Sequence, residues 1–425
     1  MNFFTSELLG FWAEWVRPTA GLPTVGWALL VAAAAAAGHL VQRYMGLPKV
    51  VGYALVGTVV GLAGFGGAVW PLRGTALFLL ELGVAIVLFE AGGRLPLGWF
   101  RHNPMVLAQS VVESLLTYAA VWQLLTWLDV PEPVAGPLAT IALAASPAVL
   151  MRVAIDTRAS GPVTERAMAL ATLGTFYALV LGYAQASLVE RTPLGLFDRF
   201  YPVLVVLGLS FVVGALMALA LRSALRVMSP TSENTSILLL AIIGAGAAVT
   251  THFGGAAPLA ALIGGVLLKL LNPRPWAWPQ QLGTASSLVT MLMFVLVSMV
   301  AAQAEWSRPV ATTVLALIVV RTIAKIAGVA LANPGSGASW RQAVWVGCAM
   351  SPLSSIALLI ASSFVTASPL LGHLVTQVAL PAILVMEVVG AVLATVAIHA
   401  AGESSRPWRP EAFPPAEETQ RDTQR

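Results

Sequence analysis

The chain has 425 residues, of which 58% are hydrophobic and only 10% are charged, with a net charge of +4. Because soluble domains carry roughly 25% charged residues, this composition predicts an all-α polytopic membrane protein and excludes an ordinary soluble domain. The basic excess does not indicate a nucleic-acid partner, since lysine and arginine mark the cytoplasmic side of a membrane protein. The lone cysteine, Cys348, excludes an internal disulfide, and the scattered histidines show no metal-ligand spacing. We therefore expect neither a metal nor another cofactor.

The first residues, 1–20, are predicted to form an interfacial segment. They contain Glu7 and Glu14 and lack the basic start and cleavage pattern of a signal peptide. Their aromatic residues suit a short helix that lies at the surface of the lipid bilayer.

Apolar stretches of about 20 residues, long enough to cross a hydrocarbon core, follow one another along the chain. The turn at 252–255 is so tight that the eighth and ninth stretches could be counted as one, which would reduce the number of spans to twelve. The thirteen predicted spans are 21–42, 47–66, 75–93, 104–128, 134–155, 164–189, 200–226, 234–252, 254–272, 283–303, 309–332, 341–367 and 373–399.

Lysine and arginine are distributed unequally between the loops. Loops after odd-numbered spans and the C-terminal tail hold 16 of the 23 basic residues, the other loops hold 5, and Arg321 and Lys325 lie within a span. The positive-inside rule predicts an external N-terminus and a cytoplasmic C-terminus in the cell's inner (plasma) membrane. The tail, 402–425, is rich in Pro, Glu, Arg and Gln and is predicted to be disordered.

Two apolar stretches are interrupted by Ser-Pro pairs. Ser146-Pro147 lies in the fifth span and Ser351-Pro352 in the twelfth. Proline removes a backbone donor and clashes with the preceding turn, and in hydrocarbon the freed carbonyls must face protein or a water-filled cavity. A single break of this kind would indicate a kink, but a matched pair indicates the midplane binding site of a transporter.

Six ionisable side chains lie within predicted spans, where each costs roughly 2.5 to 3.5 kcal/mol at a helix centre. Glu113, Arg321 and Glu387 lie deepest, whereas Glu90 lies near the end of its span and an interfacial position is an equal alternative. Lys325 shares a helix face with Arg321. Two cations on one buried face need an anion, and we expect Glu113 to lie near Arg321. The six residues are Glu81, Glu90, Glu113, Arg321, Lys325 and Glu387.

Six short motifs occur in order along the chain. They are Leu47-Pro-Lys-Val-Val-Gly-Tyr-Ala-Leu-Val-Gly57, Glu81-Leu-Gly with Leu88-Phe-Glu-Ala-Gly92, the Gly-rich stretch 256–268, Met291-Leu-Met-Phe-Val-Leu-Val297, Ser351-Pro352 with Ile356-Ala-Leu-Leu-Ile-Ala361, and Val385-Met-Glu-Val-Val-Gly390. In this order they resemble the monovalent cation:proton antiporters, in the branch that holds sodium/proton exchangers and potassium-efflux proteins. The resemblance covers residues from about 25 to 400.

The resemblance implies a transmembrane domain over 21–401, built from two inverted-topology repeats, spans one to six and eight to thirteen. Spans at about 104–189 and 309–399 would form a moving core, and those at about 21–93 and 200–303 a scaffold through which two copies form a homodimer. The two broken helices would cross in the core and present their half-helix ends at the midplane. In the family, an acidic residue on span six binds a monovalent cation and a proton alternately.

The chain departs from the family at this acidic position. Alignment places Phe176 there, or Tyr177 if the register slips by one, and no Asp or Glu lies between Arg166 and Glu190. A phenyl ring cannot exchange a proton for a cation, and a phenol is a poor proton carrier at neutral pH. The implied ion site comprises Ser146, Pro147, Thr175, Phe176, Tyr177, Ser351 and Pro352, beside a charged core of Glu113, Arg321, Lys325 and Glu387.

Three functions are compatible with these residues. The first is a secondary-active sodium or potassium/proton antiporter with alternating access, in which Glu113 or Glu387 carries the proton. The second is a transporter of the same fold for an anionic or neutral solute, attracted by Arg321 and Lys325. The third is a transport-inactive sensor or scaffold. An enzyme is not indicated, because the sequence shows no nucleophile and base pair, metal-ligand spacing or phosphate loop.

Overall fold

Helices satisfy backbone hydrogen bonds within one segment, which is what a hydrocarbon environment requires. The computed structural model describes residues 24–64, 68–95, 97–189, 196–228, 233–272 and 280–406, and these residues form helices and no β-strand apart from an isolated bridge between Ala159 and Ser404. The prediction of an all-α polytopic membrane protein is confirmed. The predicted interfacial segment, 1–20, and residues 407–425 of the tail lie outside the described residues.

The first six predicted spans each coincide with a helix or a pair of half-helices, and a short helix, α5 (Leu97–His102), precedes the fourth. They are α2 (Thr24–Leu40), which continues into the π-helical turn η1 (Val41–Met45), α3 (Lys49–Leu62), α4 (Gly74–Arg94), α6 (Pro104–Trp127), the broken pair α7 (Glu132–Leu143) and α8 (Pro147–Thr157), and α9 (Pro162–Leu188).

The other seven predicted spans are matched in the same way. Gly254, between the eighth and ninth, has a φ of +76°, a left-handed conformation that glycine adopts without steric cost, so these spans are separate helices. Eight helical segments of the described chain are long and apolar enough to cross a membrane. The seven spans are α10 (Leu196–Val227), α11 (Glu233–His252), α12 (Ala257–Leu271), α13 (Gln280–Ala301), α14 (Arg308–Leu331), the broken pair α15 (Trp340–Ala349) and α16 (Ser355–Ala367), and α17 (Pro369–Ala400).

Each Ser-Pro pair separates two half-helices instead of kinking one helix. Ser146 has extended backbone angles (φ −101°, ψ 94°), and its hydroxyl accepts a hydrogen bond from the first turn of α8 at 3.4 Å. Pro147 is the first residue of α8, a position that suits proline because an N–H there would have no partner within the helix. Ser351 and Pro352 lie in the non-helical segment between α15 and α16. Both predicted breaks are confirmed.

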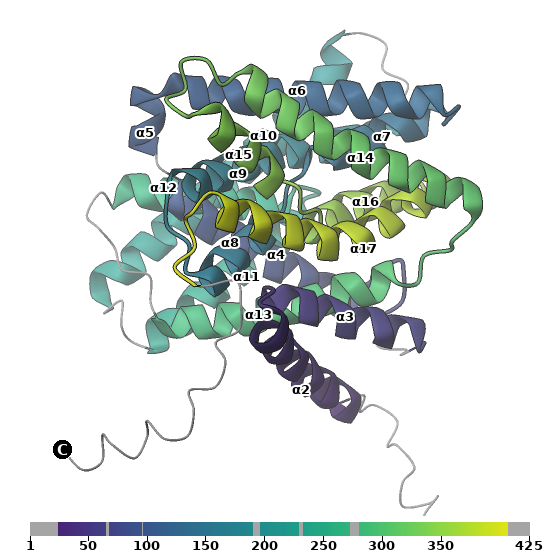
Figure 1. Cartoon of the computed structure of the whole chain (residues 1–425). Helices are drawn as coiled ribbons and strands as arrows, with labels where there is room; N and C mark the ends of the chain where they lie inside the picture. The colour runs from purple at the N-terminus through teal and green to yellow at the C-terminus, as the bar shows by residue number, and fades with distance from the viewer. Residues whose placement is uncertain are drawn as a thin grey trace, which may run out of the picture.

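The helices around the two breaks form one bundle, called the core bundle here, which consists of α6 to α9 and α14 to α17. Each half has a long helix, a broken pair and a second long helix in the same order. Figure 1 shows α6 and α14 side by side, and they run antiparallel, because Gln109 near the start of α6 donates to the carbonyl of Val329 near the end of α14 at 3.2 Å. The two halves therefore have the opposite directions of an inverted repeat. The helices α2 to α4 and α10 to α13 are called the scaffold.

Loops that the charge pattern assigns to one side of the membrane contact one another. Lys49 N, after the first span, donates to Asp156 Oδ2, after the fifth, at 2.8 Å. Arg166, at the start of the sixth span, donates to Ser336 Oγ, after the eleventh, at 2.9 Å. On the other side, Gln303 after the tenth span bonds with residues 68 and 70, after the second. This separation of odd and even loops supports an odd number of spans.

Residues 402–406, predicted to belong to a disordered tail, are instead held against the core bundle. The two carboxylate oxygens of Glu403 accept hydrogen bonds from Val163 N and Thr164 N, at the start of α9, at 2.7 Å each. Ser404 Oγ donates to the last carbonyl of α8 at 3.1 Å. The Glu403 carboxylate accepts hydrogen bonds from backbone amides that have no partner within α9, and it lies at the positive end of the dipole of this helix.

We expect the loop that holds Glu305 and the segment that holds Arg406 to lie on opposite sides of the membrane, with Arg406 on the cytoplasmic side. Both residues are exposed. In a Cys348→Ser background, the Glu305→Cys variant should react with a membrane-impermeant maleimide added to intact cells. The Arg406→Cys variant should react only after the membrane has been opened. Labelling of both variants from the same side would contradict the three spans predicted between these two residues.

Candidate functional site

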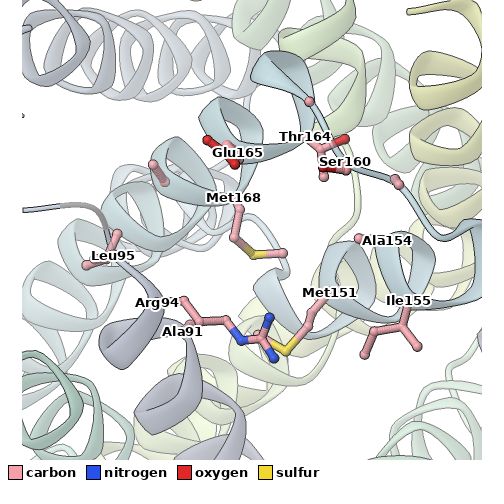
Figure 2. Close-up of a pocket in the computed structure, with 13 residues that line it drawn as sticks. Ala91, Arg94, Leu95, Met151, Ala154, Ile155, Ser160, Thr164, Glu165 and Met168 are labelled. Carbon is pink, nitrogen blue, oxygen red and sulfur yellow. The ribbon is translucent and has the colours of Figure 1, made fainter. Parts of the chain in front are cut away.

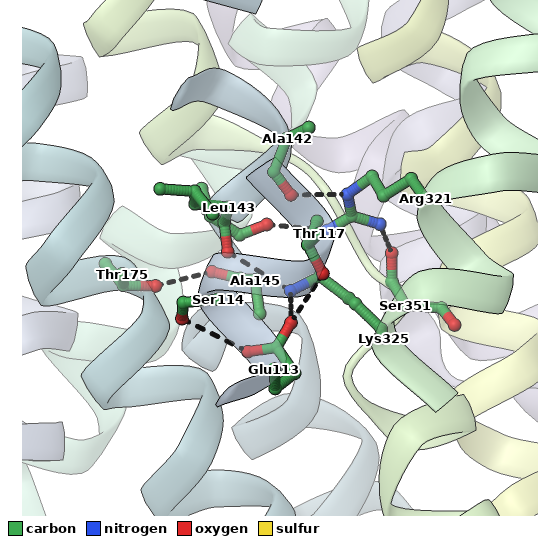
Figure 3. Close-up of polar contacts among 11 residues, drawn as sticks. Glu113, Ser114, Thr117, Ala142, Leu143, Ala145, Thr175, Arg321, Lys325 and Ser351 are labelled. Carbon is green, nitrogen blue, oxygen red and sulfur yellow. Dashed lines mark hydrogen bonds and ion pairs between the residues drawn. The ribbon is translucent and has the colours of Figure 1, made fainter. Parts of the chain in front are cut away.

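Arg321 lies where the two broken helices meet. It is fully buried, and its guanidinium donates three hydrogen bonds to backbone carbonyls: Nε to Ala142 at 2.9 Å, Nη2 to Ala144 at 2.6 Å and Nη1 to Ser351 at 2.6 Å. The Ala142 and Ala144 carbonyls lie at the C-terminal end of α7, and the Ser351 carbonyl lies two residues after the end of α15. Carbonyls at the C-terminal end of a helix lack intrahelical partners and carry partial negative charge. Figure 3 shows the side chain reaching both ends at once. The guanidinium of Arg321 therefore provides hydrogen-bond donors to unpaired carbonyls of both interrupted helices.

The two breaks also contact each other directly. Ser146 N donates to the carbonyl of Pro352 at 3.0 Å, which joins the extended segments through their backbones. Thr175 Oγ1, on α9, donates to the carbonyl of Ala145 at 2.7 Å. The structure thus brings three of the predicted site residues, Ser146, Thr175 and Pro352, to one place, and Pro147 and Ser351 adjoin them in the chain.

Lys325, one turn further along α14, forms a buried ion pair with Glu113 of α6. The Nζ–Oε1 distance is 2.6 Å, and both side chains are fully buried. Lys325 Nζ also donates to the carbonyl of Leu143 at the first break, at 3.2 Å, while Thr117 and Ser114 donate to the two carboxylate oxygens (Figure 3). Additional hydrogen bonds on both partners are what a buried ion pair needs to offset its desolvation.

Glu113 lies near the two cations of α14, as expected, but its ion-pair partner is Lys325 and not Arg321. A Cβ atom at Gly328 would lie only 2.5 Å from the Cα of Glu113, so glycine allows α6 and α14 to approach closely here. This approach places Glu113 beside Lys325, which precedes Gly328 by one turn. Arg321 lies one turn further back, where the carbonyls of the two breaks accept its hydrogen bonds.

Phe176 and Tyr177, which the sequence resemblance places at the acidic position of the family, provide no carboxylate and contact each other. Their rings meet edge to face with centroids 5.8 Å apart, and Phe176 packs against the hydrophobic core. The hydroxyl of Tyr177 accepts a hydrogen bond from Ser110 at 3.2 Å. Among the described residues of the core bundle, the fully buried acids are Glu113 and Glu387.

Glu387, near the middle of α17, is bonded to two serines. Its Oε2 accepts a hydrogen bond from Ser298 Oγ at 2.6 Å, and its Oε1 accepts one from Ser354 Oγ at 3.1 Å. Ser298 lies on scaffold helix α13, and Ser354 lies in the second break. Sequence analysis identified the acid but not the serines, because a serine within an apolar helix carries no signal that distinguishes it.

Glu81 and Glu90 lie on scaffold helix α4, away from the two breaks. Glu81 accepts a hydrogen bond from Thr251 Oγ1 at 3.2 Å. Glu90 pairs with the half-exposed Arg94 at 2.6 Å, so it lies at the edge of the buried region. The structure does not bring either acid into contact with Glu113.

Arg166 is a buried cation near the start of α9, which the count of basic residues had grouped with the loops. It donates to Ser336 through Oγ and the carbonyl at 2.9 and 2.8 Å and to Gln109 Oε1 at 3.3 Å. Its guanidinium carbon lies 5.5 Å from the ring centroid of Trp99, within the range of a cation–π contact. Arg166 thus ties the start of α9 to α6 and to the loop after α14.

A cavity of about 550 Å³ lies between scaffold helix α4 and the core-bundle helices α8 and α9. Figure 2 shows the side chains of Arg94, Met151 and Met168 around this space, with Ser160 and Glu165 at its rim. These residues belong to segments that the charge pattern places at the cytoplasmic side. The cavity therefore separates part of the scaffold from the core bundle at that side.

An inverted repeat, two broken helices that cross, and buried charges beside the crossing define a membrane transport protein. The family described as "Sodium/hydrogen exchanger, transmembrane" matches residues 28–401. The chain therefore belongs to the sodium/hydrogen exchanger family, as the motif resemblance predicted. No curated protein matches it by sequence.

Two solved structures of one protein have a similar fold. The structure of the sodium proton antiporter MjNhaP1 from Methanocaldococcus jannaschii at pH 8 superimposes with a TM-score of 0.59 over 89% of this chain and 96% of that chain, at 16% sequence identity. The electron-microscopy structure of the same antiporter gives a TM-score of 0.57 over 95% and 96% of the two chains, also at 16% identity. At this identity the similarity establishes the fold.

Loss of one member of the Glu113–Lys325 pair should destabilise the protein more than loss of both. Lys325→Met alone should cost about 3–5 kcal/mol, because it leaves a buried carboxylate without its cation, and Glu113→Gln combined with Lys325→Met should cost less. Melting temperatures of the purified protein in one detergent give the order. Arg341→Met, which removes an exposed basic side chain of the same bundle, is the control and should have little effect. If the double variant melts at the same temperature as Lys325→Met, the prediction that the two side chains stabilise each other is contradicted.

Proposed function

We propose that the protein is a secondary-active sodium or potassium/proton antiporter in which Glu113 and Lys325 take the place of the missing span-six carboxylate. Membership of the sodium/hydrogen exchanger family supports exchange of a cation for a proton. The observation that carries the assignment is the 2.6 Å contact between Lys325 Nζ and Glu113 Oε1 beside the crossing. This pair joins an acid to a side chain that can lose a proton.

Exchange at this pair follows from competition for one carboxylate. A monovalent cation that binds Glu113 displaces the ammonium of Lys325, and burial without an anion disfavours the charged form of a lysine, so Lys325 releases its proton. When the cation leaves, Lys325 takes up a proton and returns to the carboxylate. The site has the same net charge in both states, so one cation is exchanged for one proton.

We infer that the core bundle moves against the scaffold, that the crossing is reached alternately from the two sides, and that two copies form a homodimer through the scaffold in the plasma membrane. The cavity between α4 and the α8–α9 region supports access from the cytoplasmic side. The inverted order of the two halves of the core bundle supports a matching state that is open to the outside.

In proteoliposomes, an inward sodium or potassium gradient should drive outward proton movement, measured with an internal pH-sensitive dye. Glu113→Gln and Lys325→Met should each reduce this flux to the level of empty liposomes, because either change removes the competition between cation and ammonium. Glu81→Gln is the matched control, since Glu81 is a buried acid on the scaffold. It should leave the flux unchanged.

Other outcomes would select other functions. Exchange that survives Glu113→Gln would contradict the role given to this pair. Absence of cation-driven proton flux, together with anion binding that depends on Arg321, would favour a transporter of another solute. Absence of both would favour a transport-inactive sensor or scaffold.

A further inference from the structure

Glu387 is a fully buried acid that the exchange proposed at Glu113 does not use. Its carboxylate is bonded to Ser298 and Ser354, and no basic side chain in the described ranges lies within 4 Å of it. An ionised carboxylate that is buried without a cation is so costly that it becomes neutralised. Glu387 must therefore carry either a proton or another cation.

No charged group on the neighbouring helices is bonded to Glu387 in the described part of the chain. Two of the helices that pack against α17, α13 and α16, carry no titratable side chain. The most deeply buried cations nearby are Arg321, which binds carbonyls, and Lys325, which binds Glu113. The titratable side chains on the other helices packed against α17 are Lys49, Tyr53, Glu132, Arg152, Asp156, Arg308, Arg321, Lys325, Arg341 and Cys348, and none of them is hydrogen-bonded or ion-paired with Glu387.

Serine hydroxyls are suitable partners for both neutralised forms of Glu387. A hydroxyl can donate to a carboxylate, accept from a protonated carboxyl group, or offer a lone pair, and hard cations select oxygen ligands of this kind. Two further hydroxyls, Ser351 and Ser355, lie in or next to the segment that provides Ser354. Both are fully buried, and neither has a hydrogen-bond partner among the described residues.

The second break compensates the charge of Glu387 only in part. Ser354 directly precedes α16, so the carboxylate lies near the N-terminal end of this half-helix, which carries partial positive charge. Gly390, one turn after Glu387, brings α17 onto the break, because a Cβ there would lie 2.6 Å from the Cα of Pro352. The partial positive charge of the helix end stabilises the Glu387 carboxylate but does not bind its oxygens as a full cation does. The oxygens therefore remain available to an exchangeable cation.

We propose that Glu387, Ser298 and Ser354 form a second cation-exchange site, which holds either a proton or a small monovalent cation such as sodium or lithium. This inference rests on the proposed antiport function and adds a second carboxylate to it. When the cation binds, the carboxyl O–H bond breaks and the proton passes to solvent; when the cation leaves, a proton from solvent restores that bond. Ser298 belongs to the scaffold and the other two residues to the core bundle, so the bound ion lies across the surface along which the two parts would move.

Proton release upon cation binding tests the second site. Purified full-length protein in weakly buffered detergent solution would receive sodium chloride, with choline chloride as the comparison salt, and a pH indicator would count the protons released per chain. With both sites active, the wild type should release about twice as many protons as Glu113→Gln or Glu387→Gln alone, and the double variant should release none.

Two further variants serve as controls. Glu81→Gln changes a buried acid of the scaffold and should release as many protons as the wild type. Ser298→Ala keeps the carboxylate but removes one oxygen ligand, so it should weaken the apparent sodium affinity about tenfold without changing the number of protons released at saturation. This variant also tests the site if Glu387→Gln does not fold.

The outcomes separate the second site from the first. Release by Glu387→Gln equal to that of the wild type, or an unchanged sodium affinity in Ser298→Ala, would overturn the site at Glu387 and leave exchange at Glu113 in place. Release that falls in Glu387→Gln but not in Glu113→Gln would support the site at Glu387 and overturn the role proposed for Glu113.

Discussion

The core bundle depends on the contacts of Arg321 with the ends of two interrupted helices. Each break leaves carbonyls without intrahelical partners in a region where water cannot reach them freely, and a buried guanidinium without partners would be equally costly. The three hydrogen bonds from Arg321 to Ala142, Ala144 and Ser351 remove both costs at once. The bond between Ser146 N and the Pro352 carbonyl then fixes the crossing of the two backbones. Within the described residues, the breaks and the arginine therefore stabilise each other.

The crossing places the two buried acids of the core bundle in different surroundings. Glu113 has a full cation, Lys325, at 2.6 Å, because Gly328 lets α6 and α14 approach each other. Glu387 has two serine hydroxyls and a helix end, which compensate its charge without a full cation. Two carboxylates in one bundle can thus respond to the same ion by different chemistry: displacement of an ammonium at one site and loss of a carboxyl proton at the other.

Sequence analysis predicted the features that depend on composition and order, which include the helical spans, both breaks and the depth of Glu113, Arg321 and Glu387. It assigned Glu113 to the wrong cation, because Arg321 and Lys325 share a helix face and only the approach of α6 at Gly328 selects between them. The partners of Arg321 are backbone carbonyls, which no residue type reveals. The burial of Arg166 likewise depends on a loop that folds back from a distant part of the chain.

Glu403 has a mechanical consequence for the end of the chain. Its carboxylate holds the first amides of α9, and Ser404 holds the last carbonyl of α8, so α17 and the α8–α9 hairpin are fastened together just before residue 407. Ser160 and Thr164, in the same hairpin, line the cavity beside α4. A pull on the chain beyond Arg406 would therefore act on the wall of the cavity through this hairpin.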